Sequence, residues 1–404
     1  MTREELASNF ESSDARSYIL ELATGYGKSK LALEKTEQWY TPDATILIVI
    51  PKLILIDGWK KEIRKWKKEY LLPNITFVTY VSFPKIARKS WTVIIFDEAH
   101  HLSERCREFL DVIDVQYTLF LSATLKKEHK FYINAKFKSE PIKVNNRDAI
   151  KDGILPDPKV ILLKLKLDNR IVNRVIEKNI NKNNSRIPVK TIGYIEKRKY
   201  RSYKGPLRIL CTQQQYYDDA SSLIEWYKQK GMHSAVMKNV WLHKSGERLK
   251  WLAAQKEEIV KGFLKNLSNY RTLVFCPTIE DSMKLGSPCI NSKVGTASLD
   301  AFNSKRIKHI VAVGMLDEGA NITDCKIGIF QMINSSDRLN IQRVGRILRH
   351  KKPVLIFPYF INTREDDIVK DVTSGYNPDL IKVLDCTTIT NLAVTMGELK
   401  KYID

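Results

Sequence analysis

Residues 91–100 read WTVIIFDEAH. The first six positions form a nearly continuous apolar run, which is typical of a strand buried on both faces of a parallel sheet. The run ends in two neighbouring carboxylates, Asp97 and Glu98. Because such sheets bind ligands at the carboxyl ends of their strands, Asp97 is predicted to bind Mg²⁺ and Glu98 to polarise an attacking water as a general base.

A phosphate-binding turn is predicted upstream, where residues 23–29 read ATGYGKS. Gly25 and Gly27 permit a tight turn, and the backbone N–H groups that open the next helix are expected to face phosphate oxygens. Lys28 would reach the β and γ oxygens, and the Ser29 hydroxyl would ligate Mg²⁺. The residues predicted to bind the nucleotide in this turn are Thr24, Gly25, Tyr26, Gly27, Lys28 and Ser29.

The rest of the chain alternates β-branched runs with helical patterns, which is typical of an α/β fold with parallel sheets. Strands are predicted over residues 18–22, 45–50, 75–80, 93–96 and 118–121, and again over 271–275, 309–313, 327–331 and 353–357. Residues 159–204 differ, with fourteen Lys and Arg, three Asp and Glu and interleaved tyrosines, and residues 213–267 have a polar, helix-rich pattern. The sequence predicts parallel-sheet domains over residues 1–145 and 261–404, with a basic, partly helical insertion over 146–260.

The composition describes a folded, multidomain chain with a large excess of positive charge. Its 404 residues include 67 Lys and Arg and 46 Asp and Glu, a formal net charge of +21, which suits a polyanionic partner such as nucleic acid. The six cysteines show no zinc spacing and favour a reducing cytoplasm. The longest apolar run, residues 44–56, is interrupted by Pro51 and Lys52 and is too short to cross a bilayer, so no membrane role is predicted.

A basic helix is predicted near the carboxyl end, where residues 342–349 read QRVGRILR. Arg343, Arg346 and Arg349 recur at helical spacing, so one helix face presents several guanidinium groups. An arginine supplied across a cleft to a transferring phosphoryl group contributes about 10³–10⁵ in rate. The pattern therefore predicts hydrolysis that depends on closure of two domains.

Together these segments resemble the motifs of superfamily 2 helicases and translocases. Residues 97–100 look like the DEAH form of motif II, residues 23–29 like motif I, and residues 342–349 closely match motif VI. Similar segments follow in family order: motif Ia at 47–52 with Trp59 after it, motif Ib at 79–80, motif III at 122–124, motif IV at 271–278 and motif V at 317–322. The resemblance covers most of the chain and implies two RecA-like domains that use ATP and Mg²⁺.

The resemblance also implies roles for single residues. Arg346 and Arg349 would be arginine fingers, and Gln342 would contact the phosphate or the water. Gly319 would join the ATP-binding residues. The catalytic set is then Glu98, Asp97, Lys28, Gln342, Arg346 and Arg349. Ser122, Ala123 and Thr124 would couple hydrolysis to movement, and Pro51, Lys52, Thr79 and Val313 would contact nucleic acid.

The sequence predicts an ATP-dependent DNA helicase or translocase. Motifs Ia and VI most resemble the branch with phage UvsW-like, XPB-like and restriction-motor proteins, which favours DNA over RNA and a replication, recombination or repair role in a phage or bacterium. Three alternatives remain open: the motor subunit of a restriction-type complex, an RNA helicase, and a non-catalytic nucleic-acid binding or annealing protein. No Q-motif is recognisable, so selectivity for adenine is implied by the resemblance alone.

Overall fold

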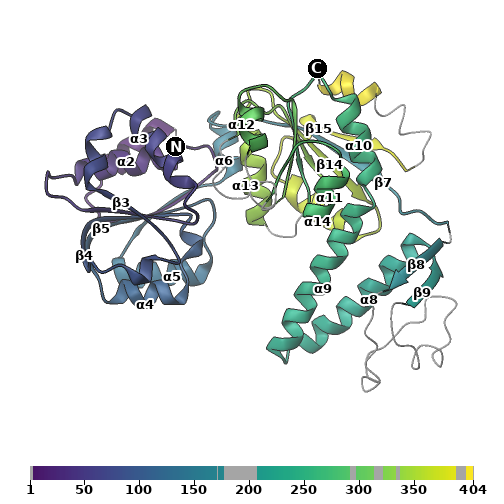
Figure 1. Ribbon diagram of the computed structural model, residues 1–404, viewed down its shortest axis with the longest axis horizontal. Helices are drawn as coiled ribbons and strands as arrows, with labels where there is room; N and C mark the ends of the chain where they lie inside the picture. The colour runs from purple at the N-terminus through teal and green to yellow at the C-terminus, as the bar shows by residue number, and fades with distance from the viewer. Residues whose placement is uncertain are drawn as a thin grey trace.

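The computed structural model describes residues 3–170, 172–176, 207–291, 297–313, 322–333, 337–387 and 397–403. Two α/β domains lie side by side, and a long helical hairpin projects from the second (Figure 1). Each domain is built on a parallel sheet, as predicted. Among the described residues, no helix is both long and apolar enough to cross a membrane.

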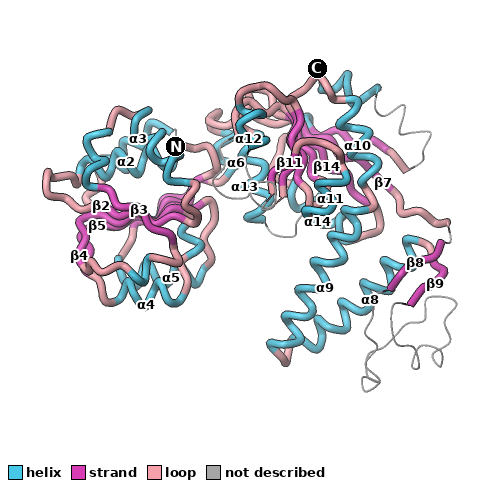
Figure 2. Tube along the Cα trace, in the orientation of Figure 1, coloured by secondary structure: helices cyan, strands magenta, loops and turns pink. Residues whose placement is uncertain are grey.

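The first domain holds a six-stranded parallel sheet whose order in space is β3-β2-β4-β5-β1-β6. Its strands are β1 (Ser17–Leu22), β2 (Ile46–Ile50), β3 (Ile75–Thr79), β4 (Ser90–Asp97), β5 (Asp114–Ser122) and β6 (Glu140–Val144). Helices α1 (Arg3–Ser12), α2 (Lys28–Gln38) and α3 (Leu55–Lys65) cover one face, and α4 (Glu104–Asp111) and α5 (Lys127–Phe137) cover the other (Figure 2). The short helix α6 (Asn146–Lys151) follows β6.

The inner strands of this sheet are buried on both faces, which explains their continuous apolar runs. All five residues of β2 are buried. Ile46, Ile48 and Ile50 pack in the large core that includes α2 and α3, whereas Leu47 and Val49 pack in a second core with α4 and α5. Successive side chains of a strand point to opposite faces, so each layer of helices has its own hydrophobic core.

The second domain holds a seven-stranded parallel sheet in the order β11-β12-β10-β13-β14-β7-β15. Its strands are β7 (Lys159–Leu165), β10 (Thr272–Phe275), β11 (Cys289–Ile290), β12 (His309–Ala312), β13 (Ile327–Phe330), β14 (Val354–Phe360) and β15 (Ile381–Asp385). Its helices are α10 (Glu257–Asn266), α11 (Ile279–Lys284), α12 (Ala297–Asn303), α13 (Asp337–Ile347) and α14 (Arg364–Thr373).

One strand of this sheet comes from an unexpected part of the chain. β7 lies between β14 and β15 and pairs with both, although its sequence falls in the segment predicted as the insertion, residues 146–260. The predicted domain limits are not tested by the structure and remain a prediction. In space, the projecting part consists of the two-stranded ribbon of β8 (Val172–Ile176) and β9 (Leu207–Cys211) and the helices α8 (Gln213–Gly231) and α9 (Ala235–Ala254). Tyr194, Tyr200 and Tyr203, the tyrosines of the basic stretch, lie outside the described residues.

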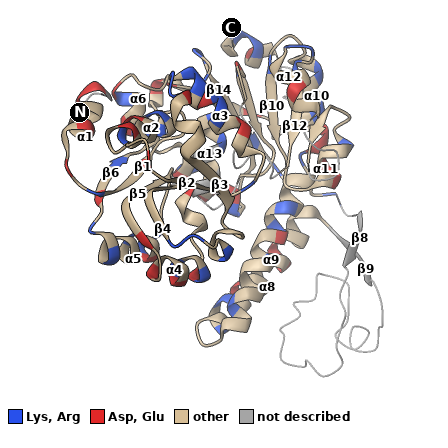
Figure 3. Ribbon diagram, turned by 60° about the vertical axis from the view of Figure 1, so that its left-hand side comes forward, with Lys and Arg blue, Asp and Glu red and all other residues tan. Residues whose placement is uncertain are grey.

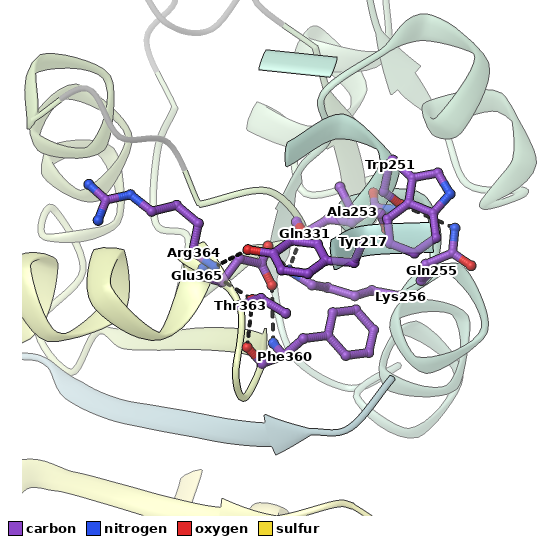
Figure 4. Close-up of polar contacts among 10 residues, drawn as sticks. All are labelled: Tyr217, Trp251, Ala253, Gln255, Lys256, Gln331, Phe360, Thr363, Arg364 and Glu365. Carbon is purple, nitrogen blue, oxygen red and sulfur yellow. Dashed lines mark hydrogen bonds and ion pairs between the residues drawn. The ribbon is translucent and has the colours of Figure 1, made fainter. Parts of the chain in front are cut away.

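A buried ion pair joins this hairpin to the second sheet (Figure 4). The Lys256 ammonium lies at the junction of α9 and α10 and donates to Glu365 Oε1 at 2.5 Å and to the carbonyl of Gln331 at 3.0 Å. Both charged side chains are fully buried. Near the start of α8, the Tyr217 hydroxyl accepts the backbone N–H of Arg364 at 2.6 Å. Both legs of the hairpin are thus held at the carboxyl ends of β13 and β14.

Candidate active site

The phosphate loop lies between β1 and α2, where two glycines adopt backbone angles that other residues rarely tolerate. Gly25 has a φ of 92° and Gly27, which caps α2, a φ of 104°. α2 then begins at Lys28, so its first backbone N–H groups face the loop. The Lys28 ammonium donates to the carbonyl of Leu22 at 2.9 Å, folded back over the loop.

The acidic pair lies at the carboxyl end of β4, which only β5 separates from β1 in the sheet order. Asp97 is the last residue of β4, and Glu98 follows in a left-handed conformation with a φ of 51°. Two aromatic side chains hold Asp97: the Trp59 indole N–H donates to Oδ2 at 2.9 Å, and the Tyr80 hydroxyl donates to the backbone carbonyl at 2.9 Å. The positive φ of Glu98 is uncommon for a residue other than glycine and indicates local backbone strain beside Asp97.

His100 connects the acidic pair to the end of β5. Its Nδ1 lies 3.4 Å from Glu98 Oε2 and 3.2 Å from Ser122 Oγ. Ser122 Oγ in turn donates to the Thr124 carbonyl at 2.7 Å, which shapes the turn after β5. The residues that the sequence analysis expected to couple hydrolysis to movement, Ser122, Ala123 and Thr124, therefore lie one side chain away from Glu98.

The charges at this site alter one another's protonation. Burial raises the pKa of Asp97 to about 6, and the negative charge of Glu98 raises it as well. Burial also lowers the pKa of the Lys28 ammonium, while Glu98 and Asp97 act in the opposite direction. A carboxyl group with a raised pKa near an ammonium with a lowered pKa is typical of functional sites.

Binding of a divalent cation to this site is expected to weaken below about pH 6. A carboxylate must lose its proton before it can ligate a metal, and the pKa of Asp97 is about 6. The apparent affinity for Mn²⁺ should therefore be constant at pH 7–8 and fall by up to about tenfold per unit below pH 6. Mn²⁺ titrations followed by electron paramagnetic resonance would measure it. An affinity that does not change between pH 5 and pH 7.5 would contradict the assignment of Asp97 as ligand.

Helix α13 of the second domain lies against the phosphate loop of the first. A Cβ atom added at Gly345 would stand 2.4 Å from Cβ of Thr24, so the two backbones approach closely here. Arg349 and Arg346 are near enough to Lys28 that their positive charges lower its pKa further. Arg346 is buried, with 5% of its surface exposed. Arg346 of α13 and Arg349, two residues beyond the end of that helix, therefore bring positive charge from the second domain close to the phosphate loop of the first.

A methyl group at Gly345 is expected to keep this cleft from closing. In Gly345→Ala the new Cβ would overlap Thr24, whose Cβ is fixed close to the backbone and has no room to move away. ATP hydrolysis should fall by about one to two orders of magnitude, since a displacement of 1 Å can cost about 10²-fold. Gly246→Ala is the matched control, because a Cβ there meets nothing within 4 Å. Steady-state kinetics of both variants would decide, and equal activities would contradict the close approach.

The other expected site residues fall into three groups. Pro51, Lys52 and Thr79 lie at the carboxyl edge of the first sheet and Val313 at that of the second. Gln342 lies in α13, but nothing is described of its side chain, and Gly319 lies outside the described residues. Arg343 does not face the nucleotide loop in the way its spacing suggested. Its guanidinium instead lies over the Phe275 ring of its own domain, 5.4 Å from the ring centre.

Two contacts of this site are not predicted by the sequence. Trp59 follows the segment that resembles motif Ia, but no local pattern indicates its hydrogen bond to Asp97. The close approach of Gly345 to Thr24 was not foreseen either. A glycine inside a helical pattern is unfavourable unless packing requires it. Gly345 therefore indicates a close contact. The sequence does not show that Thr24 is the partner.

The residues present fit ATP with a divalent cation. The loop offers backbone N–H groups and the half-buried Lys28 ammonium for phosphate oxygens, and Asp97 offers a carboxylate for a hard cation. Ser29 follows Lys28 in the first turn of α2 and supplies a hydroxyl there. Positive groups thus come from both domains and a carboxylate from one, as a triphosphate with its cation requires.

Comparison with known proteins agrees with this arrangement. Residues 2–127 match the family described as Type III restriction enzyme, res subunit, and residues 255–351 match the Helicase conserved C-terminal domain. The DNA 3'-5' translocase XPB2 of Sulfurisphaera tokodaii is 25% identical over 359 residues, which cover 82% of this chain and 75% of the relative.

Two solved structures show the same fold at low identity. The S. cerevisiae Dbp5 structure bound to RNA and ADP BeF3 has a TM-score of 0.61 at 11% identity, and the match covers 99% of this chain and 93% of that chain. The Pyrococcus furiosus Hef helicase domain has a TM-score of 0.50 at 14% identity, with 91% of this chain and 97% of that chain covered. Both support two RecA-like domains with a helical region between them.

Proposed function

The chain is a two-domain helicase of superfamily 2 that resembles XPB-type translocases, and from this premise we propose that it is an ATP-driven motor that moves along DNA. It hydrolyses ATP, as its helicase domains and its XPB-like relative indicate. The observation that carries the proposal is the position of α13: its Gly345 meets Thr24, and its Arg346, together with Arg349 just after the helix, lies near Lys28. Hydrolysis therefore depends on how the two domains meet.

Each residue of the site has a proposed task. Lys28 and the N–H groups of the loop bind the phosphate oxygens, and Glu98 orients the water and accepts its proton. Mg²⁺, held by Asp97 and Ser29, would supply positive charge to the phosphate oxygens. Arg346 and Arg349 stabilise the charge that develops on the transferring group, but only while the second domain is docked. ATP turnover thus brings the two domains together and apart. The domains would then bind the nucleic acid tightly in turn.

Nucleic acid is proposed to cross the carboxyl edges of both sheets. The loop after β2 contains Pro51 and the exposed Lys52, and the side chain of Leu53 beside them is 65% exposed. The loop after the neighbouring strand β3 exposes Val81 by 75%. Exposed aliphatic groups next to a lysine suit sugars and bases beside phosphates. Lys and Arg residues also lie along α9 (Figure 3), so the hairpin is a further candidate for contact.

DNA is proposed over RNA because a relative that is similar over 82% of this chain is described as a DNA translocase. Motifs Ia and VI most resemble the branch with UvsW-like and XPB-like proteins, which further suggests a role in replication, recombination or repair in the cytoplasm of a bacterium or phage-infected cell. A second candidate is the motor subunit of a restriction complex, which the match of residues 2–127 favours. Copurification with a partner that carries nuclease activity would support that candidate over a free-standing motor.

The test is ATP hydrolysis with and without single-stranded DNA, duplex DNA, forked DNA and RNA. We expect DNA to stimulate the wild type strongly, and Lys28→Ala to abolish hydrolysis on every substrate. Because the chain carries a net charge of +21, binding should also weaken with salt, with a slope of about 0.7 per phosphate contacted on a single strand. A wild type that is equally slow with and without every nucleic acid would contradict the motor.

A further inference from the structure

Helix α3 presents a buried indole to the catalytic carboxylate. Trp59 lies one turn into α3 and only 4% of its surface is exposed. Its Nε1–H donates to Asp97 Oδ2 at 2.9 Å. The backbone N–H of Glu98 donates to the same carboxylate. The carboxylate of Asp97 thus accepts one hydrogen bond from Trp59 of α3 and one from the backbone of Glu98.

The ring that carries this donor is fixed by the core. Trp59 packs in the large hydrophobic cluster of the first domain, and Ile63, one turn further along α3, is fully buried. The direction of the N–H is therefore set before any ligand arrives, which avoids an entropic cost on binding. A preorganised donor of this kind determines how a ligating carboxylate is oriented.

The chemistry of indole suits this task better than that of other polar side chains. Its N–H is a donor and has no acceptor, so it binds one carboxylate oxygen and never competes with Asp97 for a cation. A lysine or arginine in its place would add a positive charge that repels a cation. An amide could turn its oxygen toward the carboxylate. Trp59 is uncharged, rigid and can only donate.

We propose that Trp59 is a positioning residue for the metal ligand: its N–H fixes the carboxylate of Asp97 in the orientation that binds the divalent cation accompanying the nucleotide. The inference rests on the proposed function, because it takes Asp97 as the ligand. Trp59 itself touches neither nucleotide nor metal. It acts only through Asp97, so its loss should weaken metal binding before it affects the binding of nucleotide in the absence of metal.

The test compares Mn²⁺ binding in three proteins by electron paramagnetic resonance, in the presence of a non-hydrolysable ATP analogue. Trp59→Phe keeps an aromatic ring and removes the donor. Loss of a group that orients a metal ligand typically weakens metal affinity by about 10–100-fold, and we expect a loss of at least about tenfold. The matched control is Trp66→Phe at the end of the same helix, where the indole donates to Glu62 Oε2 at 2.9 Å. This control should bind Mn²⁺ as the wild type does.

A second replacement protects the test against misfolding. Benzothienylalanine at position 59 has a sulfur in place of the N–H and otherwise the shape of tryptophan, so packing is retained. It should weaken Mn²⁺ binding as Trp59→Phe does, with an unchanged melting temperature. Wild-type affinity in the benzothienylalanine protein, or an equal loss in Trp66→Phe, would overturn the proposal. A wild type that binds no Mn²⁺ with nucleotide would instead overturn the proposed function, so the two failures are distinguishable.

Discussion

Arg346→Ala is expected to slow ATP hydrolysis by about 10³–10⁵-fold. Arg346 is buried in α13 and lies close enough to Lys28 to affect its pKa, so it can reach the phosphates only from the second domain. An arginine that stabilises developing charge acts on the transition state far more than on bound ATP. The Kd for ATP should therefore change by only a few fold while kcat falls. Stopped-flow binding of a fluorescent ATP analogue and steady-state hydrolysis would measure the two effects separately.

The matched control for this variant is Arg306→Ala. Arg306 belongs to the same domain and is exposed, and its Nε donates to Ser304 Oγ. Removing it takes away the same charge without touching the cleft, so hydrolysis should stay at the wild-type level. The arginine-finger role would be wrong if Arg346→Ala and Arg306→Ala had the same kcat, or if Arg346→Ala lost ATP binding and hydrolysis in equal measure.

Glu98→Gln is expected to reduce kcat by about 10²–10⁴-fold, the range for loss of a general base. Glutamine has the size of glutamate and can remain near His100, whose Nδ1 lies 3.4 Å from Glu98 Oε2. It cannot accept a proton from water. ATP and metal should therefore still bind, and the protein should be held in its ATP-bound, closed form. Filter binding of radiolabelled ATP together with a hydrolysis assay would show bound ATP that is not turned over.

Glu108→Gln is the control for this second change, since Glu108 is an exposed residue of α4 in the same domain. Its hydrolysis should equal that of the wild type. Substantial turnover by Glu98→Gln would show that another group takes the proton. Loss of ATP binding in the same variant would show that Glu98 holds the nucleotide rather than the water.

Much of the fold could be predicted because parallel strands that are buried on both faces need continuous apolar runs. The prediction of residues 45–50 corresponds to β2 at Ile46–Ile50, and that of 271–275 to β10 at Thr272–Phe275. The strands that were missed carry weaker signals. β6 is an edge strand with a proline, β11 has only two residues, and β15 mixes polar and apolar residues at an edge. β7 is apolar, but it opens a strongly basic segment, which is why the sequence predicts it as part of the insertion.

The candidate site could be predicted only where its residues are neighbours in sequence. Residues 23–29 and 97–100 carry their chemistry in a fixed local spacing, and the structure places them at the carboxyl ends of β1 and β4, with only β5 between these strands. Contacts such as that of Trp59 with Asp97 join segments far apart in the chain. They follow from how α3 packs on the sheet, and periodicity alone does not specify that packing.

The attachment of the α8–α9 hairpin has a mechanical consequence. Lys256 and Glu365 clamp its base to the second domain, and a buried pair of this kind is costly to break because each charge would be left alone in the interior. The hairpin must then move with that domain as one rigid body. With a rise of 1.5 Å per residue, the 20 residues of α9 extend about 30 Å. If the second domain rotates by about 10° about the base of the hairpin, the tip of α9 moves by about 5 Å. One opening or closing of the domains would then displace nucleic acid bound at the tip by more than the rise of about 3.4 Å per nucleotide.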